Sequence, residues 1–340
     1  MSHIYLTRNL METPLLPLHT QFYNYIQRSP IIHAATYSHG PQLHFKDETV
    51  QESGLFKDRG ALNCMLHMYD SQRKRMEEAG VVAASAGNHG QGVARAGKYL
   101  GVSVTLFVPS TTPQSKVEAM LQYGASVKTV AGDVDDALKT AQIYCSDTSA
   151  LFVHPFEDEA VITGQSTVGR EIYNEKVHTS FDKVFVPVGG GGLLAGVCLG
   201  LASKGYLGEV YGVQLEGADA FARSMHACNA TELEYTNPLS DGTAVRRAGE
   251  LALNHVRASE NYVDTIVVTE AELGDAIVLQ DQLTGIYGEP AGCLAFAGMK
   301  RLVDSHHHGN TQNWLGIISG KHRDPLRYKA LISAAQNACG

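Results

Sequence analysis

Short apolar stretches alternate with longer amphipathic segments between residues 80 and 155, and this alternation constrains the fold more than any other feature of the chain. The apolar stretches are 81–84, 102–108, 125–130 and 151–153. Strands that alternate with helices form βαβ units, whose parallel sheet is covered by helices on both faces. The pattern therefore predicts an α/β domain over residues 80–155.

A second series of strands and helices follows toward the C-terminus. Strands are expected at 184–188, 209–215, 265–268 and 315–318, with helices beginning near 160, 193, 270, 290 and 325. A chain of 340 residues is long enough for two domains. We expect two α/β domains, each with a mostly parallel sheet flanked by helices. The large domain takes 1–79 and 156–340, and the small domain takes 80–155.

Composition limits the partners that the chain can have. Hydrophobic residues make up 44% and charged residues 18%, as in an ordinary globular protein. A net charge of -8 provides no basic surface for nucleic acid or an anionic membrane, and no apolar run is long enough to span a bilayer. The six cysteines are widely spaced and form no CxxC pair, which favours reduced thiols in a cytoplasmic protein. A small-molecule substrate is the remaining expectation.

One lysine stands at the start of an expected helix. Lys57 follows the turn residues Ser53 and Gly54, and the small side chains of Ala61 and Cys64 share its helical face. An ammonium among small side chains at the positive end of a helix dipole is costly to keep charged, so its pKa should be lowered. A free amine is what an imine-forming lysine needs. For a lysine considered alone, a solvated position in the first helical turn is the simpler interpretation.

Two loops that follow expected strands carry the other candidate residues. Ser85–Gly92 combines Asn88 and His89 with small residues, so that backbone N–H groups can approach an anion. Gly189–Gly192 stands directly before a helix, which is the arrangement of a phosphate-binding helix N-terminus. Both loops are expected at the carboxyl ends of strands, where open α/β sheets bind ligands.

The same glycine run allows a second interpretation. Gly190, Gly192 and Ala195 have the GxGxxA spacing of a dinucleotide-binding turn, and Glu216 lies near the end of the next strand. A nicotinamide oxidoreductase therefore remains an alternative at this point.

Five motifs, in order, resemble those of the tryptophan-synthase-β-like (fold type II) pyridoxal-phosphate enzymes. They are the lysine motif at 53–63, the S-A-G-N-H-x-Q loop at 85–91, G-G-G-G-L at 189–193, E-P-A-G at 289–292 and Ser319-Gly320. The similarity runs from about residue 29 to 320 and is greatest to the serine/threonine dehydratases, to which 164–167 and 240–245 also correspond.

The resemblance implies a role for each motif. Lys57 would hold pyridoxal 5'-phosphate as an imine and then remove the substrate Cα proton, and Ser319 would be a neutral partner of the pyridine nitrogen. Cofactor contacts are implied for Phe56, Lys57, Asn88, Gly189, Gly190, Gly191, Gly192, Leu193, Glu289 and Ser319. Substrate contacts are implied for Ser85, Ala86, Gly87 and His89.

Some residues depart from the pattern of the family. Leu55 replaces the usual serine before Phe-Lys, and Lys321-His322 replace a glycine and an asparagine. Gln214 and Ala220 stand where metal-binding relatives have carboxylates, so no divalent metal site is expected. The run His306-His307-His308 reads as a solvated surface tract, with metal binding as the alternative.

The resemblance implies a pyridoxal-phosphate-dependent ammonia-lyase. It would convert L-threonine and/or L-serine to a 2-oxo acid and ammonia by β-elimination, that is, by dehydration and deamination. Relatives form homodimers or homotetramers, so a homo-oligomer is expected. Besides the nicotinamide oxidoreductase, a catalytically silent pyridoxal-phosphate-fold binding protein remains an alternative, because Leu55 and Lys321 alter family motifs.

Overall fold

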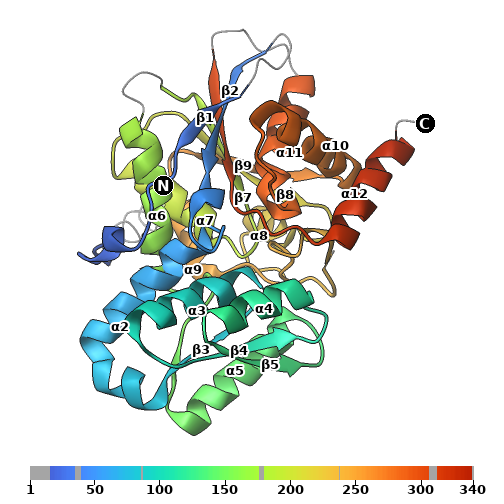
Figure 1. Ribbon diagram of the computed structural model, residues 1–340. Coiled ribbons are helices and arrows are strands. Elements are labelled where there is room, and N and C mark those ends of the chain that lie inside the picture. The colour runs from blue at the N-terminus through green and yellow to red at the C-terminus, as the bar shows by residue number, and fades with distance from the viewer. Residues whose placement is uncertain are drawn as a thin grey trace. The chain divides into compact units, whose positions relative to one another are not determined.

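The computed structural model describes residues 16–34, 40–85, 87–175, 180–236, 238–305 and 312–338. These residues form two compact units (Figure 1). The smaller unit takes 16–27 and 51–165, and the larger takes 28–50 and 166–338. Each unit has its own sheet flanked by helices, which confirms the predicted fold class.

The smaller unit is built on a four-stranded parallel sheet with the order β5-β4-β3-β6. Its strands are β3 (Val81–Ala84), β4 (Val104–Pro109), β5 (Ser126–Val130) and β6 (Leu151–Phe152). Its helices are α2 (Lys57–Ala79), α3 (Asn88–Leu100), α4 (Gln114–Gln122) and α5 (Val134–Thr148). The strand and helix alternation that is visible in the sequence thus becomes a sheet with helices on both faces.

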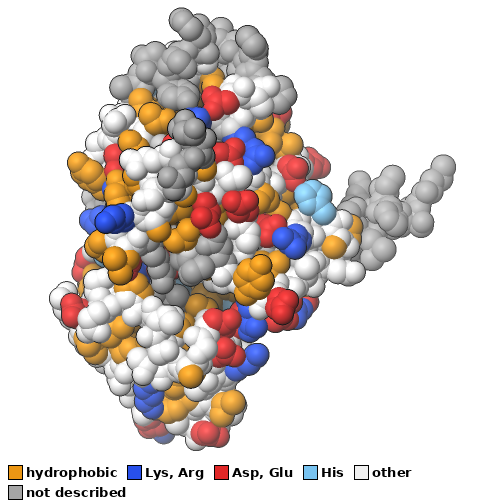
Figure 2. Space-filling model, turned by 90° about the vertical axis from the view of Figure 1, so that its right-hand side faces the viewer, with side chains coloured by type: hydrophobic (Ala, Val, Ile, Leu, Met, Phe, Trp, Pro, Cys, Tyr) orange, Lys and Arg blue, Asp and Glu red, His pale blue; other side chains and the backbone are white. Residues whose placement is uncertain are grey.

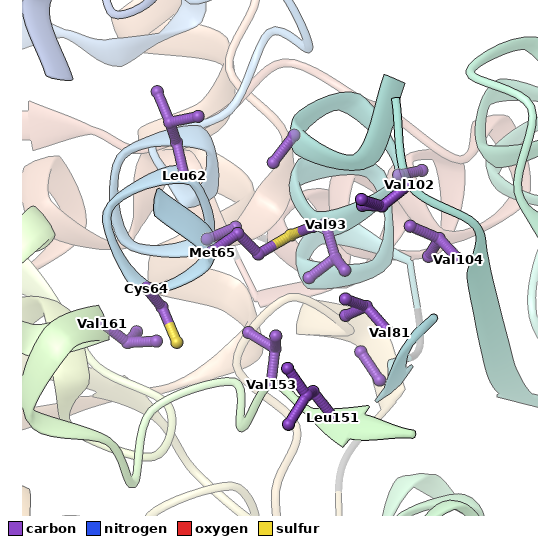
Figure 3. Close-up of a cluster of buried hydrophobic side chains, with 14 of the residues drawn as sticks. Leu62, Cys64, Met65, Val81, Val93, Val102, Val104, Leu151, Val153 and Val161 are labelled. Carbon is purple, nitrogen blue, oxygen red and sulfur yellow. The ribbon is translucent and has the colours of Figure 1, made fainter. Parts of the chain in front are cut away.

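Alternate side chains of the strands divide the apolar residues between the two faces of this sheet. Val81 and Ala83 join the cluster that includes α2 and α3, whereas Val82 and Ala84 pack with α5. Figure 3 shows the first cluster, in which Met65 of α2 points toward Val93 of α3. Because all four residues of β3 are buried, the strand reads as a continuous apolar run in the sequence.

The larger unit contains a six-stranded sheet with the order β1-β2-β10-β7-β8-β9. Its strands are β1 (Ile31–His33), β2 (Gln42–Asp47), β7 (Lys183–Pro187), β8 (Glu209–Leu215), β9 (Tyr262–Val268) and β10 (Asn313–Ile318). β1 pairs antiparallel with β2, and the other pairs are parallel. The carboxyl ends of β10, β7 and β8 therefore lie along one edge of the sheet.

Helices cover both faces of this second sheet (Figure 1). Side chains of α10 (Glu270–Thr284) and α11 (Pro290–Ser305) pack with Phe45, Phe185 and Val213 of the strands. Helix α7 (Gly192–Ala202) packs on β7. Helix α6 (Glu159–Asn174) lies close to α7, since a Cβ on Gly200 would be only 2.1 Å from Ser166 O. The remaining helices are α8 (Ala220–Ala227), α9 (Glu250–Arg257) and α12 (Pro325–Ala338).

The structure differs from the sequence expectations in three places. Residues 16–27, 51–79 and 156–165 group with the smaller unit rather than with the larger one, because Phe22 and Met65 share a core with α3. The helix α3 begins at Asn88, although the glycines that follow suggested a loop up to Gly92. The short helices α8 and α9 were not expected from the sequence.

On the described part of the face in Figure 2, acidic and basic side chains lie interspersed among uncharged and hydrophobic ones. Across the described residues, no helix is both long enough and apolar enough to cross a membrane.

Candidate active site

Lys57 is the first residue of α2. Its Nζ donates a hydrogen bond to Pro155 O at 2.9 Å and lies 5.2 Å from the centre of the Phe56 ring. Burial of the ammonium lowers the pKa of Lys57 from 10.5 to about 8. The direction of this shift is the one that the sequence suggested. A substantial fraction of Lys57 is therefore neutral near physiological pH.

Glycines allow two helices to approach the first turn of α2. A Cβ on Gly92 of α3 would lie 3.0 Å from Lys57 O, and a Cβ on Gly164 of α6 would lie 2.5 Å from Arg59 O. Gly60 is equally confined, since its Cβ would meet Gln165 Nε2 at 2.3 Å. These three glycines therefore allow the start of α2 to pack closely against α3 and α6.

A buried acid fixes the turn that precedes Lys57. Asp58 Oδ2 accepts a hydrogen bond from Ser53 N at 3.1 Å and lies 3.4 Å from Arg95 Nη1 of α3. Both charged side chains are almost completely buried. Burial raises the pKa of Asp58, and Arg95 opposes that shift. The contact ties the turn to α3.

The asparagine loop follows β3 as expected. Ser85 Oγ accepts the N–H of Gly87 at 2.9 Å, and Gly87 adopts φ +146° immediately before Asn88 opens α3. The N–H groups of the first turn of α3 point to the N-terminal side of that helix, where an anion is favoured. Ala86 lies outside the described residues.

His89 is held in a neutral form. Its Nε2–H donates to Val153 O at 3.1 Å, which leaves Nδ1 as an acceptor, and Nδ1 is buried with no hydrogen-bond partner among the described residues. Burial, and then the charge of Lys57, lowers the pKa of His89 to about 3. In this arrangement the ring offers no donor to a carboxylate. A substrate contact of His89 would therefore use its backbone N–H.

His154 and Pro155 lie beside Lys57, and the sequence analysis missed both. They follow β6, and His154 Nδ1 accepts hydrogen bonds from Phe156 N and Glu157 N at 3.3 and 2.8 Å. Burial, and then the charge of Lys57, lowers the pKa of His154 to about 4. Their position directly after a strand of the parallel sheet was the signal that could have identified them.

The glycine run of the larger unit joins β7 to α7. Gly191 adopts φ +97°, and a Cβ there would lie 2.4 Å from Phe221 Cε2. A Cβ on Gly189 would meet Thr243 Cα at 3.0 Å, and Gly190 O accepts the N–H of Gly249 at 3.0 Å. Because α7 begins at Gly192, the loop presents backbone N–H groups at a helix N-terminus without side chains.

Glu289 and Ser319 are brought together in the same unit. The N–H of Glu289 donates to Gly320 O at 2.8 Å, and a Cβ on Gly292 would lie only 2.6 Å from that oxygen. Ser319 is buried directly after β10, at the same sheet edge as the glycine run after β7. Arg323, which follows the altered residues Lys321 and His322, donates to Gly288 O at 2.6 Å and so supports the turn before Glu289.

Gln214 stands where metal-binding relatives have a carboxylate ligand. Its Nε2 donates to Ala218 O at 3.0 Å, and its Oε1 accepts the N–H of Ala222 at 2.9 Å. Within the described residues, no group of three or more His, Cys, Asp or Glu side chains is placed to hold a metal ion. The run 306–308 lies outside the described residues.

A family model described as "Pyridoxal-phosphate dependent enzyme" matches residues 23–320. The chain belongs to this family of pyridoxal-phosphate-dependent enzymes. The L-threonine ammonia-lyase of Thermotoga maritima is 37% identical to this enzyme over 284 residues, which are 83% of this chain and 69% of that protein.

Solved structures of pyridoxal-phosphate enzymes have the same fold. The processed form of threonine deaminase isoform 2 from Solanum lycopersicum has a TM-score of 0.85 and 29% identity, over 98% of this chain and 88% of that chain. Maize serine racemase has a TM-score of 0.80 and 25% identity, over 99% of each chain.

Family membership decides between the two cofactors that the glycine run allowed. The nicotinamide alternative is wrong, and in the structure Glu216 accepts the N–H of Glu270 at 3.2 Å. The residues present fit pyridoxal phosphate. Lys57 has a lowered pKa, and Gly189 and Gly191 form a loop in which any Cβ would collide with its neighbours. Each of these features was expected from the motif to which it belongs.

Proposed function

We propose that this enzyme dehydrates and deaminates L-threonine and/or L-serine, giving a 2-oxo acid and ammonia. The observation that carries the proposal is Lys57, a lysine with a pKa of about 8 at the start of a helix that three glycines help to fix in place. Its amine can bond to a cofactor aldehyde and can later take up a proton within the same pH range. Bound pyridoxal phosphate supplies the electron sink for loss of the Cα proton.

Each residue has a proposed task toward the cofactor. Lys57 would hold the cofactor covalently and would remove the proton from the substrate Cα, and Phe56 would pack on the cofactor ring. Ser319 would be the neutral partner of the pyridine nitrogen, which would make the ring a weaker electron sink and favour direct loss of the β-hydroxyl. Asn88 would hydrogen-bond the 3-oxygen of the cofactor. The cofactor phosphate would bind to Gly189, Gly190, Gly191, Gly192 and Leu193, and Glu289 is the remaining proposed contact.

The substrate carboxylate is proposed to bind at the N-terminus of α3. The backbone N–H groups of Asn88 and His89 favour an anion there, and the hydroxyl of Ser85 is a further donor. The neutral rings of His89 and His154 add no positive charge at this place above about pH 5. The helix terminus, rather than the two imidazoles, therefore selects the carboxylate.

Cellular context and assembly belong to the same proposal. The described cysteines are unpaired, and three of them, Cys64, Cys198 and Cys293, are buried thiols, in keeping with a cytoplasmic enzyme. A homodimer or homotetramer is proposed from the family resemblance.

The test combines product release with identification of the modified lysine. We expect purified protein to show the visible absorbance of bound pyridoxal phosphate and to release 2-oxobutyrate from L-threonine or pyruvate from L-serine. Borohydride reduction and peptide mass analysis should place the pyridoxyl group on Lys57. A coloured protein that releases no 2-oxo acid from any β-hydroxy amino acid would instead support the silent binding protein.

A further inference from the structure

A second lysine lies buried against the asparagine loop. Lys116 belongs to α4 and is 3% exposed. Its Nζ donates a hydrogen bond to Asn88 Oδ1 at 3.3 Å. The two residues are 28 positions apart, and the packing of α3 against α4 brings them together.

The stem of Lys116 passes directly over Gly87. A Cβ on Gly87 would lie 2.3 Å from Lys116 Cδ, 3.3 Å from its Cγ and 3.4 Å from its Cβ. Gly87 also has φ +146°, so that any side chain there would both collide with the lysine and strain the backbone. The glycine of the asparagine loop is thus the site at which the lysine crosses the loop to reach Asn88.

The chemistry of this contact fixes the orientation of the Asn88 amide. An ammonium can only donate, so the atom that faces Lys116 must be the carbonyl oxygen of the amide. The Nδ2 group, which carries the two hydrogens, must then point away from Lys116. In this orientation Asn88 offers a ligand the hydrogens of its Nδ2 group rather than its carbonyl oxygen. The neighbouring positive charge of Lys116 makes the Nδ2 group a stronger hydrogen-bond donor.

We propose that Lys116 is a positioning residue that holds the Asn88 amide in the orientation needed to donate to the anionic 3-oxygen of pyridoxal phosphate. This inference rests on the proposed function, because it takes Asn88 as the partner of that oxygen. Lys116 acts through Asn88 and through its charge. It does not form the covalent bond, which belongs to Lys57.

The variant Lys116→Met removes the ammonium and keeps an unbranched apolar stem over Gly87. We expect the apo-protein of this variant to bind pyridoxal phosphate about tenfold more weakly, because an oriented charge-assisted hydrogen bond is lost. In the loaded protein, the pH midpoint of the visible absorption band should move upward by about half a unit or more, since loss of a nearby positive charge disfavours the more anionic form of the cofactor. Lys116→Arg, which retains the charge, should preserve both values more closely.

A double-mutant cycle separates positioning from a general effect on folding. In an Asn88→Ala background, Lys116→Met should change the cofactor affinity less than twofold, because the residue through which it acts is gone. Lys139→Met, on exposed α5, is the matched control for loss of one positive charge from this unit. If Lys116→Met does not fold, the shorter neutral variant Lys116→Gln gives the same comparison.

Two results would overturn the inference. One is an unchanged affinity and absorption midpoint in both neutral variants, and the other is an equal loss of affinity with and without Asn88. Either result counts against the inference only if the wild-type protein binds pyridoxal phosphate. Failure of the proposed function is distinct, because the wild type itself would then bind no cofactor or release no 2-oxo acid.

Discussion

The reactivity of Lys57 depends on what surrounds one nitrogen atom. Its Nζ contacts Pro155 O, and the adjacent rings of His89 and His154 are held neutral by their own burial and by this lysine. Three basic groups near one another cannot all be charged in a buried place. Of the three groups, Lys57 has the highest pKa, so a single proton shared among them resides on Lys57.

The first prediction concerns the pH dependence of cofactor attachment. Only the unprotonated amine reacts with an aldehyde, so the rate of covalent attachment to apo-protein should rise about tenfold per pH unit below 8 and level off above about 8. Stopped-flow absorbance at saturating pyridoxal phosphate measures this rate. A rate that keeps rising to pH 10 would show that the Lys57 pKa is not lowered, and Lys57→Ala should show no attachment at any pH.

A second prediction at this scale concerns stereochemistry. In the serine racemases that this chain resembles, a serine two residues before the loop asparagine returns a proton to the far side of the substrate Cα, and the sequence has Ala86 at that position. A methyl group can neither give nor take a proton, so we expect proton transfer from one face only. L-Serine should be converted to pyruvate without accumulation of D-serine, and Ala86→Ser should raise D-serine above the wild-type background. Chiral chromatography after long incubation measures both. D-Serine formed by the wild type at a rate comparable with pyruvate would contradict the prediction.

At the scale of the element, the loop between β7 and α7 depends on its backbone conformation rather than on side chains. Its shape requires a positive φ at Gly191 and the absence of a Cβ that would meet Phe221. Helix α7 then supplies N–H groups whose direction is set by the helix axis. The proposed phosphate site would thereby be independent of any side-chain rotamer.

The prediction at this scale compares two glycines with positive φ. Gly191→Ala should weaken cofactor binding by a factor of ten or more, because the methyl group must displace Phe221 and the loop with it. Gly205→Ala is the control, since Gly205 has φ +72° with nothing within 4 Å of its Cβ position. Fluorescence titration with pyridoxal phosphate and thermal unfolding distinguish the two. Equal effects of both variants on cofactor affinity would contradict the prediction.

At the scale of the whole molecule, acid should affect the two units differently. His89 and His154 both lie in the smaller unit, and burial holds their folded-state pKa values at about 3 and 4, below the ordinary 6.5. The unfolded chain therefore binds these protons first, and stability falls as the pH drops below 6.5. Each histidine contributes a slope of about 1.4 kcal/mol per pH unit until its folded-state pKa is reached.

Two optical probes can follow this behaviour in the apo-protein. Trp314 is the single tryptophan and is buried in the larger unit, so its fluorescence reports on that unit alone. Between pH 6.5 and 4, far-ultraviolet circular dichroism should lose signal before the tryptophan emission changes. His154→Asn should move the first transition to lower pH. Coincident transitions in the two signals would show that the units unfold together.

The sequence allowed prediction of those features that depend on local patterns. Strand β3 and the motifs around Lys57 and Asn88 could be recognised because neighbouring residues determine them. The contact of Lys116 with Asn88 could not, because it depends on how α4 packs against α3. The tautomer of His89 is likewise set by Val153, which follows β6 and is 64 positions away in the sequence. The grouping of α2 with the smaller unit follows from shared core packing.

The hydrogen bonds of Gln214 hold the segment before α8 with a permanent part of the protein. The amide joins Ala218 O to Ala222 N, and the segment between them leads into α8, whose Phe221 borders the glycine run. A metal ion in such a place would be exchangeable, and its occupancy would follow the free concentration of that ion in the cell. A side chain is covalently attached and is present at every site from the moment of folding. The segment that carries Phe221 to the glycine run is thus held at fixed stoichiometry by a side chain of the protein itself.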